Sequence, residues 1–189
     1  MAQRDWNDLS DEYYQRLWDG LEVLEAWQPE VERQAGRARA LVERYRAVEA
    51  ESGVPWAVVA AIHMREADFD LTCNLCNGEP LDRVTRQVPR GRGPYATWEA
   101  SALDALEMER AAFPEVWTVA GVGRFLERYN GLGYARKGEH SPYLWSGSTA
   151  GLGAGKYTED GRYDPGAVDD QVGAMLLILA LGELGPTSG

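Results

Sequence analysis

The sequence predicts a mainly α-helical fold with a small β-hairpin lobe, and three observations support this. Apolar residues recur at intervals of three and four over most of the chain, which is typical of helices with one buried face. Proline and glycine separate these stretches and end them. Only the segment 82–88 has the composition of a short strand and turn. A chain of 189 residues suits one domain with its own core, and we treat 1–189 as a single domain.

Each expected helix has a start or stop signal. Ser10, followed by two acidic residues, can begin the first helix, and Pro29 ends it. Thr97 can cap the fourth helix, and Pro114 stops it. Asp164 precedes the proline that opens the last helix. The expected helices cover residues 10–28, 30–51, 55–66, 98–113, 119–129 and 165–185, with the hairpin at 82–88 after the third of them and a glycine- and tyrosine-rich loop at 130–164.

The third helix ends on the strongest candidate for chemistry, Glu66. The residues before it leave almost no polar face, so this helix is expected to lie deep in the core. Negative charge is disfavoured at a helix C-terminus and in apolar surroundings, and both effects favour a protonated carboxyl. A carboxyl that keeps its proton near neutral pH can act as a general acid. The alternative is that Glu66 pairs with Arg65 or another cation as an ordinary solvated helix end.

A second carboxylate is expected from the β lobe. Glycosidases place two carboxyl groups on either side of the bond that they cleave. Glu79 lies on the turn 77–81, which could fold back over the end of the helix that carries Glu66. Asp68, Asp70 and Asp82 compete with it for this role.

Two segments are candidates for ligand binding. In the segment 128–134, a helix ends in Tyr129 and Asn130, and glycines before Tyr134 let the backbone approach a ligand. Tyrosine rings cover the apolar faces of sugars and amides bond their polar groups, although a simple helix cap at Asn130 or Gly131 is the alternative. The segment 151–157 lacks the residues of a phosphate-binding loop. It is better interpreted as a turn that presents Tyr157 to a groove, or as plain loop packing.

We expect neither a metal nor another cofactor. His63 and Glu66 share one helix face and could form a metal-binding pair, but no motif supplies a third ligand. A core histidine, or one that orients its neighbours, is the favoured interpretation, and we count His63 with the substrate-binding residues. Cys73 and Cys76 could be free thiols, a disulfide or half of a zinc site. A zinc site needs two more ligands, and only His63 and His140 are available.

The net charge of −11 argues against nucleic-acid binding and weakens attraction to any anionic polymer. No apolar run is long enough to span a bilayer, so we expect no membrane span. The polar N-terminus has no signal-peptide core, so we expect a chain that is made in the cytoplasm and either stays there, is released by a route that needs no cleaved signal, or is already trimmed.

The segment 60–69 resembles the catalytic helix of the lysozyme superfamily, in which an apolar helix ends in the acid. It is most similar to soluble lytic transglycosylases, goose-type lysozymes and phage-type lysis proteins. The segment 128–131 resembles the Tyr-Asn motif of that group, which lies about sixty residues after the acid. The likeness covers roughly residues 50–182 and includes the turn 77–81 and the run 141–163. It departs from the family at Ala67, where serine is usual, and in lacking a Gly-x-Met-Gln segment.

The resemblance implies an α+β lysozyme-like fold, with a catalytic core at 50–185 and an N-terminal helical extension at 1–49 packed on it. It implies a peptidoglycan hydrolase that acts as a monomer on the glycan strand after release or export. Such a muramidase cleaves the β-1,4 bond between N-acetylmuramic acid and N-acetylglucosamine. Glu66 would be the acid, Glu79 the second carboxylate, and Tyr129 and Asn130 cleft residues. The alternatives are a lytic transglycosylase that forms 1,6-anhydro products, a non-catalytic wall-binding module and a chitin hydrolase.

Overall fold

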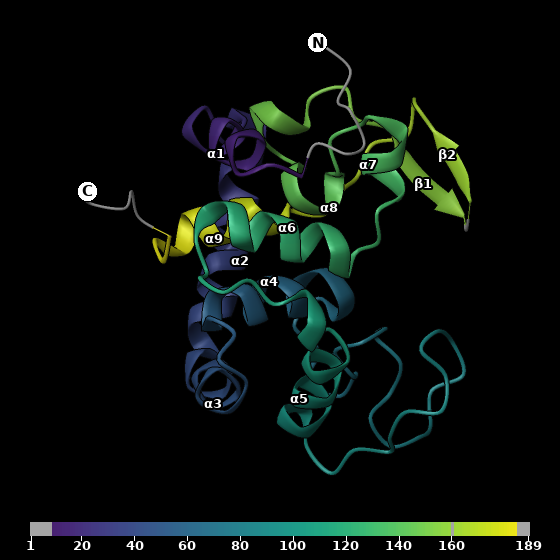
Figure 1. Ribbon diagram of the computed structural model, residues 1–189. Coiled ribbons are helices and arrows are strands. Elements are labelled where there is room, and N and C mark those ends of the chain that lie inside the picture. The colour runs from purple at the N-terminus through teal and green to yellow at the C-terminus, as the bar shows by residue number, and fades with distance from the viewer. Residues whose placement is uncertain (1–8, 160, 185–189) are drawn as a thin grey trace.

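The computed structural model describes residues 9–159 and 161–184, and these form a mainly helical fold (Figure 1). The predicted fold class is confirmed, because helices dominate the described residues and the sheet found there is a single two-stranded antiparallel hairpin. The α-helices are α1 (Asp11–Asp19), α2 (Gln28–Ala40), α3 (Val42–Ser52), α4 (Trp56–Ala67), α5 (Trp98–Met108), α6 (Val119–Tyr129), α7 (Gly133–Lys137), α8 (Pro142–Trp145) and α9 (Ala174–Leu181). The strands are β1 (Lys156–Glu159) and β2 (Arg162–Asp164), and short 3₁₀ turns cover Glu25–Trp27, Arg110–Ala112 and Thr149–Gly151.

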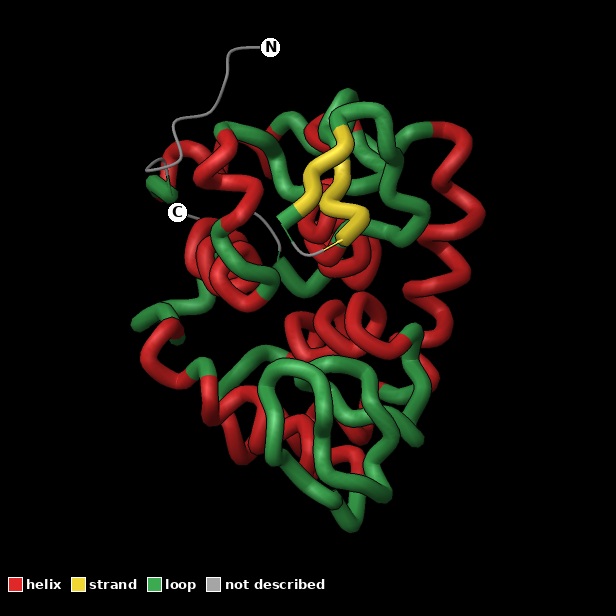
Figure 2. The backbone as a smooth tube through the Cα atoms, turned by 90° about the vertical axis from the view of Figure 1, so that its right-hand side faces the viewer, coloured by secondary structure: helices red, strands yellow, loops and turns green. Residues whose placement is uncertain are grey.

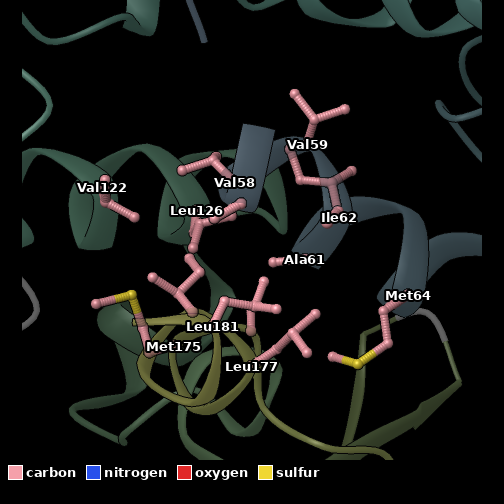
Figure 3. Close-up of a cluster of buried hydrophobic side chains, with 14 of the residues drawn as sticks. Val58, Val59, Ala61, Ile62, Met64, Val122, Leu126, Met175, Leu177 and Leu181 are labelled. Carbon is pink, nitrogen blue, oxygen red and sulfur yellow. The ribbon is translucent and has the colours of Figure 1, made fainter. Parts of the chain in front are cut away.

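The core is built around α4. Every residue from Trp56 to Met64 is buried, so this helix has no solvent-facing side over that length. It packs against α2, α3 and α9, and α9 is itself almost wholly apolar. Figure 3 shows side chains of α4, α6 and α9 gathered in one cluster: Val58, Val59, Ala61, Ile62, Met64, Val122, Leu126, Met175, Leu177 and Leu181.

The hairpin and the long loop 68–97 project from the same side of the molecule. In Figure 1 the hairpin lies at the upper right and the loop at the lower right, with α4 and α6 between them. Figure 2 looks at that side directly and shows the strands above and the loop below. α4 ends at Ala67, directly before this loop begins.

Side-chain caps fix three helix starts. The hydroxyl of Ser10 accepts a hydrogen bond from the Tyr13 N–H, and that of Thr97 accepts one from Ala100, so both expected caps are confirmed. Thr118 caps α6 in the same way. At the N-terminal side of the chain, α1 packs against α6 and α2 packs against α9. Residues 1–8 of the expected extension and the expected boundary at 185 lie outside the described residues.

The position of the hairpin differs from the prediction. The segment 82–88 forms no strand, because the backbone N–H groups of Arg86 and Gln87 bond to the carboxylate of Glu79 instead of a neighbouring strand. Val84 and Val88, which would have formed the buried face, are 47% and 80% exposed. The hairpin lies instead at 156–164, within the stretch predicted to be loop.

Several helix boundaries also differ from the prediction. The first helix ends at Asp19, because residues 20–24 pair with the segment 147–149; Leu24, for example, donates to the carbonyl of Gly147 at 3.0 Å. The second divides at Leu41 into α2 and α3. The last helix begins only at Ala174, since the preceding residues enter an ionic network around Asp169.

None of the helices in residues 9–159 and 161–184 has the length and apolar character that crossing a bilayer requires.

Two helix glycines give opposite predictions for stability. A Cβ at Gly123 in α6 would lie 2.4 Å from the ring of Tyr14, which is fully buried in α1. Such overpacking costs about 1–3 kcal/mol, more than the ~1 kcal/mol that alanine gains over glycine in a helix. We expect Gly123→Ala to lower the free energy of unfolding in urea. Gly36→Ala, in α2 with nothing within 4 Å of the new methyl group, serves as the control and should raise it. A stabilising Gly123→Ala would show that α1 does not pack on α6 this closely.

Candidate active site

Glu66 lies in the last turn of α4, and the chain reverses directly after it. Asp68 and Phe69 have φ angles of +46° and +62°, which residues other than glycine rarely adopt. The guanidinium of Arg37 holds this reversal, donating to the Asp68 carboxylate at 2.6 Å and to its carbonyl oxygen at 2.5 Å. The returning loop then packs on Glu66, because a Cβ on Gly78 would lie only 2.6 Å from the Glu66 carbonyl oxygen. Glycine at that position is therefore required for the close approach.

The carboxyl group of Glu66 is partly buried and hydrogen-bonded. The hydroxyl of Tyr143 in α8 donates to Glu66 Oε1 at 3.0 Å, and Tyr143 is only 5% exposed. Burial raises the pKa of Glu66 from 4.5 to about 7, against the opposite effects of the Tyr143 hydrogen bond and the Arg65 charge. The Glu66 carboxyl can therefore hold its proton near neutral pH, where an ordinary glutamate is ionised.

Arg65 is next to Glu66 in sequence but is paired elsewhere. Its Nη2 lies 2.6 Å from Asp169 Oδ2, and the two side chains are 6% and 2% exposed. Although burial acts in the other direction, Arg65 holds the pKa of Asp169 below its usual value. The described residues show no ion pair between Arg65 and Glu66, so the Glu66 carboxyl is not neutralised by its neighbour and can keep its proton.

A cleft of about 530 Å³ is lined by Arg65 and Tyr143, the two residues next to Glu66 in sequence and in hydrogen bonding, whereas Glu66 itself is not part of the lining. Tyr143 lies in the wall of this cleft, and its hydroxyl is hydrogen-bonded to the carboxyl group of Glu66. This volume falls within the range of small-molecule sites in proteins. The residues that line it come from α4, the α6–α7 region, α8, the hairpin and the segment before α9: Arg65, Asn130, Gly131, Gly133, Tyr134, Arg136, Tyr143, Lys156, Tyr157, Gly161 and Asp169.

The hairpin is attached to α7 through tyrosines. The hydroxyl of Tyr134 accepts a hydrogen bond from the Tyr157 N–H at 3.1 Å, and the Tyr157 hydroxyl donates to the carbonyl of Gly133 at 3.3 Å. The rings of Tyr134, Tyr157 and Tyr163 lie edge to face, with centroids 5.0–6.4 Å apart. Tyr134 and Tyr157, both expected to bind substrate, are thus brought together in the wall of the cleft.

Tyr129 and Asn130 occupy different places. Asn130 lines the cleft and is exposed, and Gly131 after it takes the left-handed conformation at φ +89°. Tyr129 is not part of the cleft lining, and its hydroxyl donates to the carbonyl of Leu75 at 3.1 Å. It therefore ties the loop 68–97 to α6 instead of lining the cleft.

Glu79 organises the long loop. Its carboxylate accepts hydrogen bonds from the N–H groups of Gln87 and Arg86, both at 2.9 Å to Oε2, and from the side-chain amide of Asn77 at 3.1 Å. These bonds lower the pKa of Glu79, so it is ionised at neutral pH. Glu79 is not part of the cleft lining described above, although Gly78 before it touches the end of α4.

His63 is fully buried beneath the site. Its Nε2 lies 3.2 Å from the Asp70 carbonyl oxygen, which can only accept, so Nε2 carries the proton. Nδ1 then accepts from the Tyr45 hydroxyl at 3.0 Å. Burial lowers the pKa of His63 to about 4 and keeps the ring neutral. His63 therefore holds the start of the long loop and has no surface to offer a substrate, contrary to the expected binding role.

The described residues contain no cluster of three or more potential metal ligands. Cys73 and Cys76 are free thiols, the first of the three predicted possibilities. The Cys76 thiol donates to the side chain of Asn74 at 2.9 Å, and burial raises its pKa to about 11. Both cysteines therefore serve the packing of the loop.

Sequence reasoning missed Tyr143 and the pair of Arg65 with Asp169. Tyr143 lies 77 positions from Glu66, and Asp169 lies 104 from Arg65, so no periodic pattern connects them. The only signal was the likeness of the run 141–163 to lysozyme-like proteins, which marked the segment without giving Tyr143 a role.

The raised pKa of Glu66 predicts how stability depends on pH. Between pH 4.5 and about 7 the folded protein binds more protons at Glu66 than the unfolded chain, so this contribution to stability falls as pH rises. His63 acts in the opposite direction between about 4 and 6.5, because its folded pKa is lowered. The difference between wild type and Glu66→Gln isolates the first effect. We expect the free energy of unfolding of wild type minus that of Glu66→Gln, both measured in urea, to decrease steadily from pH 4.5 to 7.5. A flat difference would mean that Glu66 titrates normally.

In comparisons with known proteins, no protein-family model, no curated protein and no solved structure matches the chain.

Proposed function

We propose that the protein is a peptidoglycan-cleaving muramidase and that Glu66 is its general acid. The observation that carries the proposal is the partly buried Glu66 carboxyl group, which is hydrogen-bonded to Tyr143, a residue in the wall of a cleft that also contains tyrosine and amide groups. A carboxyl with a pKa of about 7 is suited to protonate a leaving oxygen at neutral pH. The likeness of the segments 60–69 and 128–131 to lysozyme-type sequences supports the choice of substrate.

In the proposed reaction, Glu66 donates its proton to the glycosidic oxygen between N-acetylmuramic acid and N-acetylglucosamine. The developing positive charge on the sugar needs a carboxylate or a nucleophile on the other side. Glu79 is the candidate that is ionised, and its Oε1 has one N–H neighbour, Arg86, which leaves it able to accept from a water. The pKa of Glu66 is raised and that of Glu79 is lowered, as is typical of a catalytic acid and the carboxylate that acts with it.

One observation favours a second outcome, that of a lytic transglycosylase. Glu79 is held by three N–H donors within its own loop, which limits its freedom to activate water. Without an effective base, the 6-hydroxyl of the muramoyl residue can attack the anomeric carbon itself and form a 1,6-anhydro sugar.

Glu66→Gln tests the acid directly. Glutamine keeps the shape and can still accept from Tyr143, but it has no proton to donate to a leaving oxygen at neutral pH. Since general acid catalysis contributes about 10²–10⁴-fold, we expect clearing of a suspension of purified cell walls to fall by at least about 100-fold, with an unchanged circular dichroism spectrum. In wild type, clearing should decline as pH rises through about 7. Full clearing by Glu66→Gln would exclude Glu66 as the acid. Glu43→Gln, the same substitution at an exposed glutamate of α3, is the matched control.

Mass spectrometry of the digestion products separates the two outcomes. We expect wild type to release fragments with reducing muramoyl ends, because Glu79 remains ionised and able to position water. Glu79→Gln should then slow release of these fragments, with its thermal unfolding followed in parallel because the same carboxylate holds the loop. Exclusive release of 1,6-anhydro ends would instead establish the transglycosylase.

A further inference from the structure

The cleft has a local charge opposite to that of the chain. The whole protein carries a net charge of −11. The cleft wall nevertheless contains Arg65, Arg136 and Lys156 and a single acidic residue, Asp169. Cations gathered in a concave site raise the local concentration of anionic groups, even on an acidic protein.

The one acid in the wall does not balance these cations. Asp169 is shared, with one oxygen 2.6 Å from Arg65 Nη2 and the other 3.1 Å from Lys156 Nζ. Lys156 also lies 3.8 Å from Asp170, but that side chain is 91% exposed and outside the lining, so water screens its charge. A surplus of positive charge therefore faces the cleft.

Two arginines in the same wall keep N–H groups without an acceptor among the described residues, and the Arg65 guanidinium also lies over the Tyr143 ring at 4.8 Å. Arg65 Nε is buried and has no hydrogen-bond acceptor, although Arg65 lines the cleft and is only 6% exposed. Burial of this N–H without an acceptor is costly, so the positive charge of Arg65 stays in the wall at an energetic cost. Arg136 in α7 is exposed, and the described residues offer its guanidinium neither an ion pair nor a hydrogen bond. A guanidinium presents a planar fork that fits a carboxylate.

We propose that this cationic wall, with Arg136 as its free member, binds a carboxylate carried by the muramoyl residue of the substrate. This rests on the proposed function and narrows it: the 3-O-lactyl group distinguishes muramic acid from N-acetylglucosamine, and it ends in a carboxylate or in a peptide that bears carboxylates. Neutral chitin chains have no such group. The surplus charge thus selects peptidoglycan over chitin and gives an acidic protein a local attraction for an anionic polymer.

Binding to defined glycans tests this inference apart from catalysis. The protein is the full chain with Glu66→Gln, so that no probe is cleaved. The probes are a tetrasaccharide of alternating N-acetylglucosamine and N-acetylmuramic acid with free lactyl carboxylates, its methyl ester, a peptide-bearing form and chitotetraose. We expect the free acid or the peptide-bearing form to bind at least about five-fold more tightly than the methyl ester, which corresponds to ~1 kcal/mol for one exposed ion pair. This preference should weaken as salt is added.

Arg136→Gln should remove most of the preference. Arg128→Gln is the matched control, since it deletes the same charge from an exposed arginine that lies near the end of α6 but not in the cleft wall. A preference seen only with the peptide-bearing form assigns the carboxylate to the peptide, and one seen with the bare glycan assigns it to the lactyl group. Equal affinity for acid and ester, no binding of any probe, or a preference that survives Arg136→Gln would overturn the inference.

Release of sugar ends by the wild-type enzyme is measured in parallel. If the enzyme cleaves cell walls but binds the acid and the ester equally well, the proposed function is supported and the inference about the carboxylate is wrong. Charge-dependent binding by a protein that cleaves nothing would remove the function and keep the site.

Discussion

The burial of α4 is the constraint on which the rest of the structure depends. Its neighbours bury it from Trp56 to Met64, and only the last turn approaches the surface. Full burial of one large apolar side chain contributes about 1.5–3 kcal/mol, and four consecutive side chains of α9, Met175 to Ile178, are completely inaccessible. A neutral polar group left without its hydrogen bond costs about 1–3 kcal/mol. The helix packing can therefore hold Glu66 in partly desolvated surroundings without endangering the fold.

The protonation of Glu66 also depends on which carboxylate pairs with Arg65, the arginine next to it in the sequence. Arg65, directly before Glu66, lowers the pKa of the acid through its charge, but this effect is smaller than that of burial. Here Asp169 binds Arg65 at 2.6 Å in a buried pair, although the two residues lie 104 positions apart in the sequence. Separating these partners would leave a buried charge unpaired, so the pair is held firmly. Asp169 thus acts on Glu66 through Arg65, and it keeps the same arginine in the wall of the cleft.

The sequence was informative where structure is local and uninformative where contacts are long-range. An unbroken apolar helix ending in Glu66 could be predicted, since burial follows from composition and the end follows from spacing. The caps at Ser10 and Thr97 were likewise local. Tyr143 could not be found in this way, because its role arises from a hydrogen bond to Glu66 across 77 positions of the sequence. The hairpin was misplaced because exposed valines at 84 and 88 imitate a strand, whereas the strands at 156–164 are fixed by tyrosine contacts with α7.

The loop 68–97 carries Glu79, the proposed second carboxylate, and is held against the buried helix α4. It is tied to the helical core at its start by His63 and Asp70, along its length by Tyr129 and Leu75, and at Gly78 by direct contact with the Glu66 backbone. The turn that carries Glu79 is therefore positioned relative to the acid by three separate contacts. Glu79 in turn closes the loop by accepting N–H groups, which keeps it ionised and also occupies one of its oxygens. The same bonds thus make Glu79 a charged partner for a developing positive charge and a restrained base for water. Which of these two effects is larger decides between hydrolysis and intramolecular attack by the sugar.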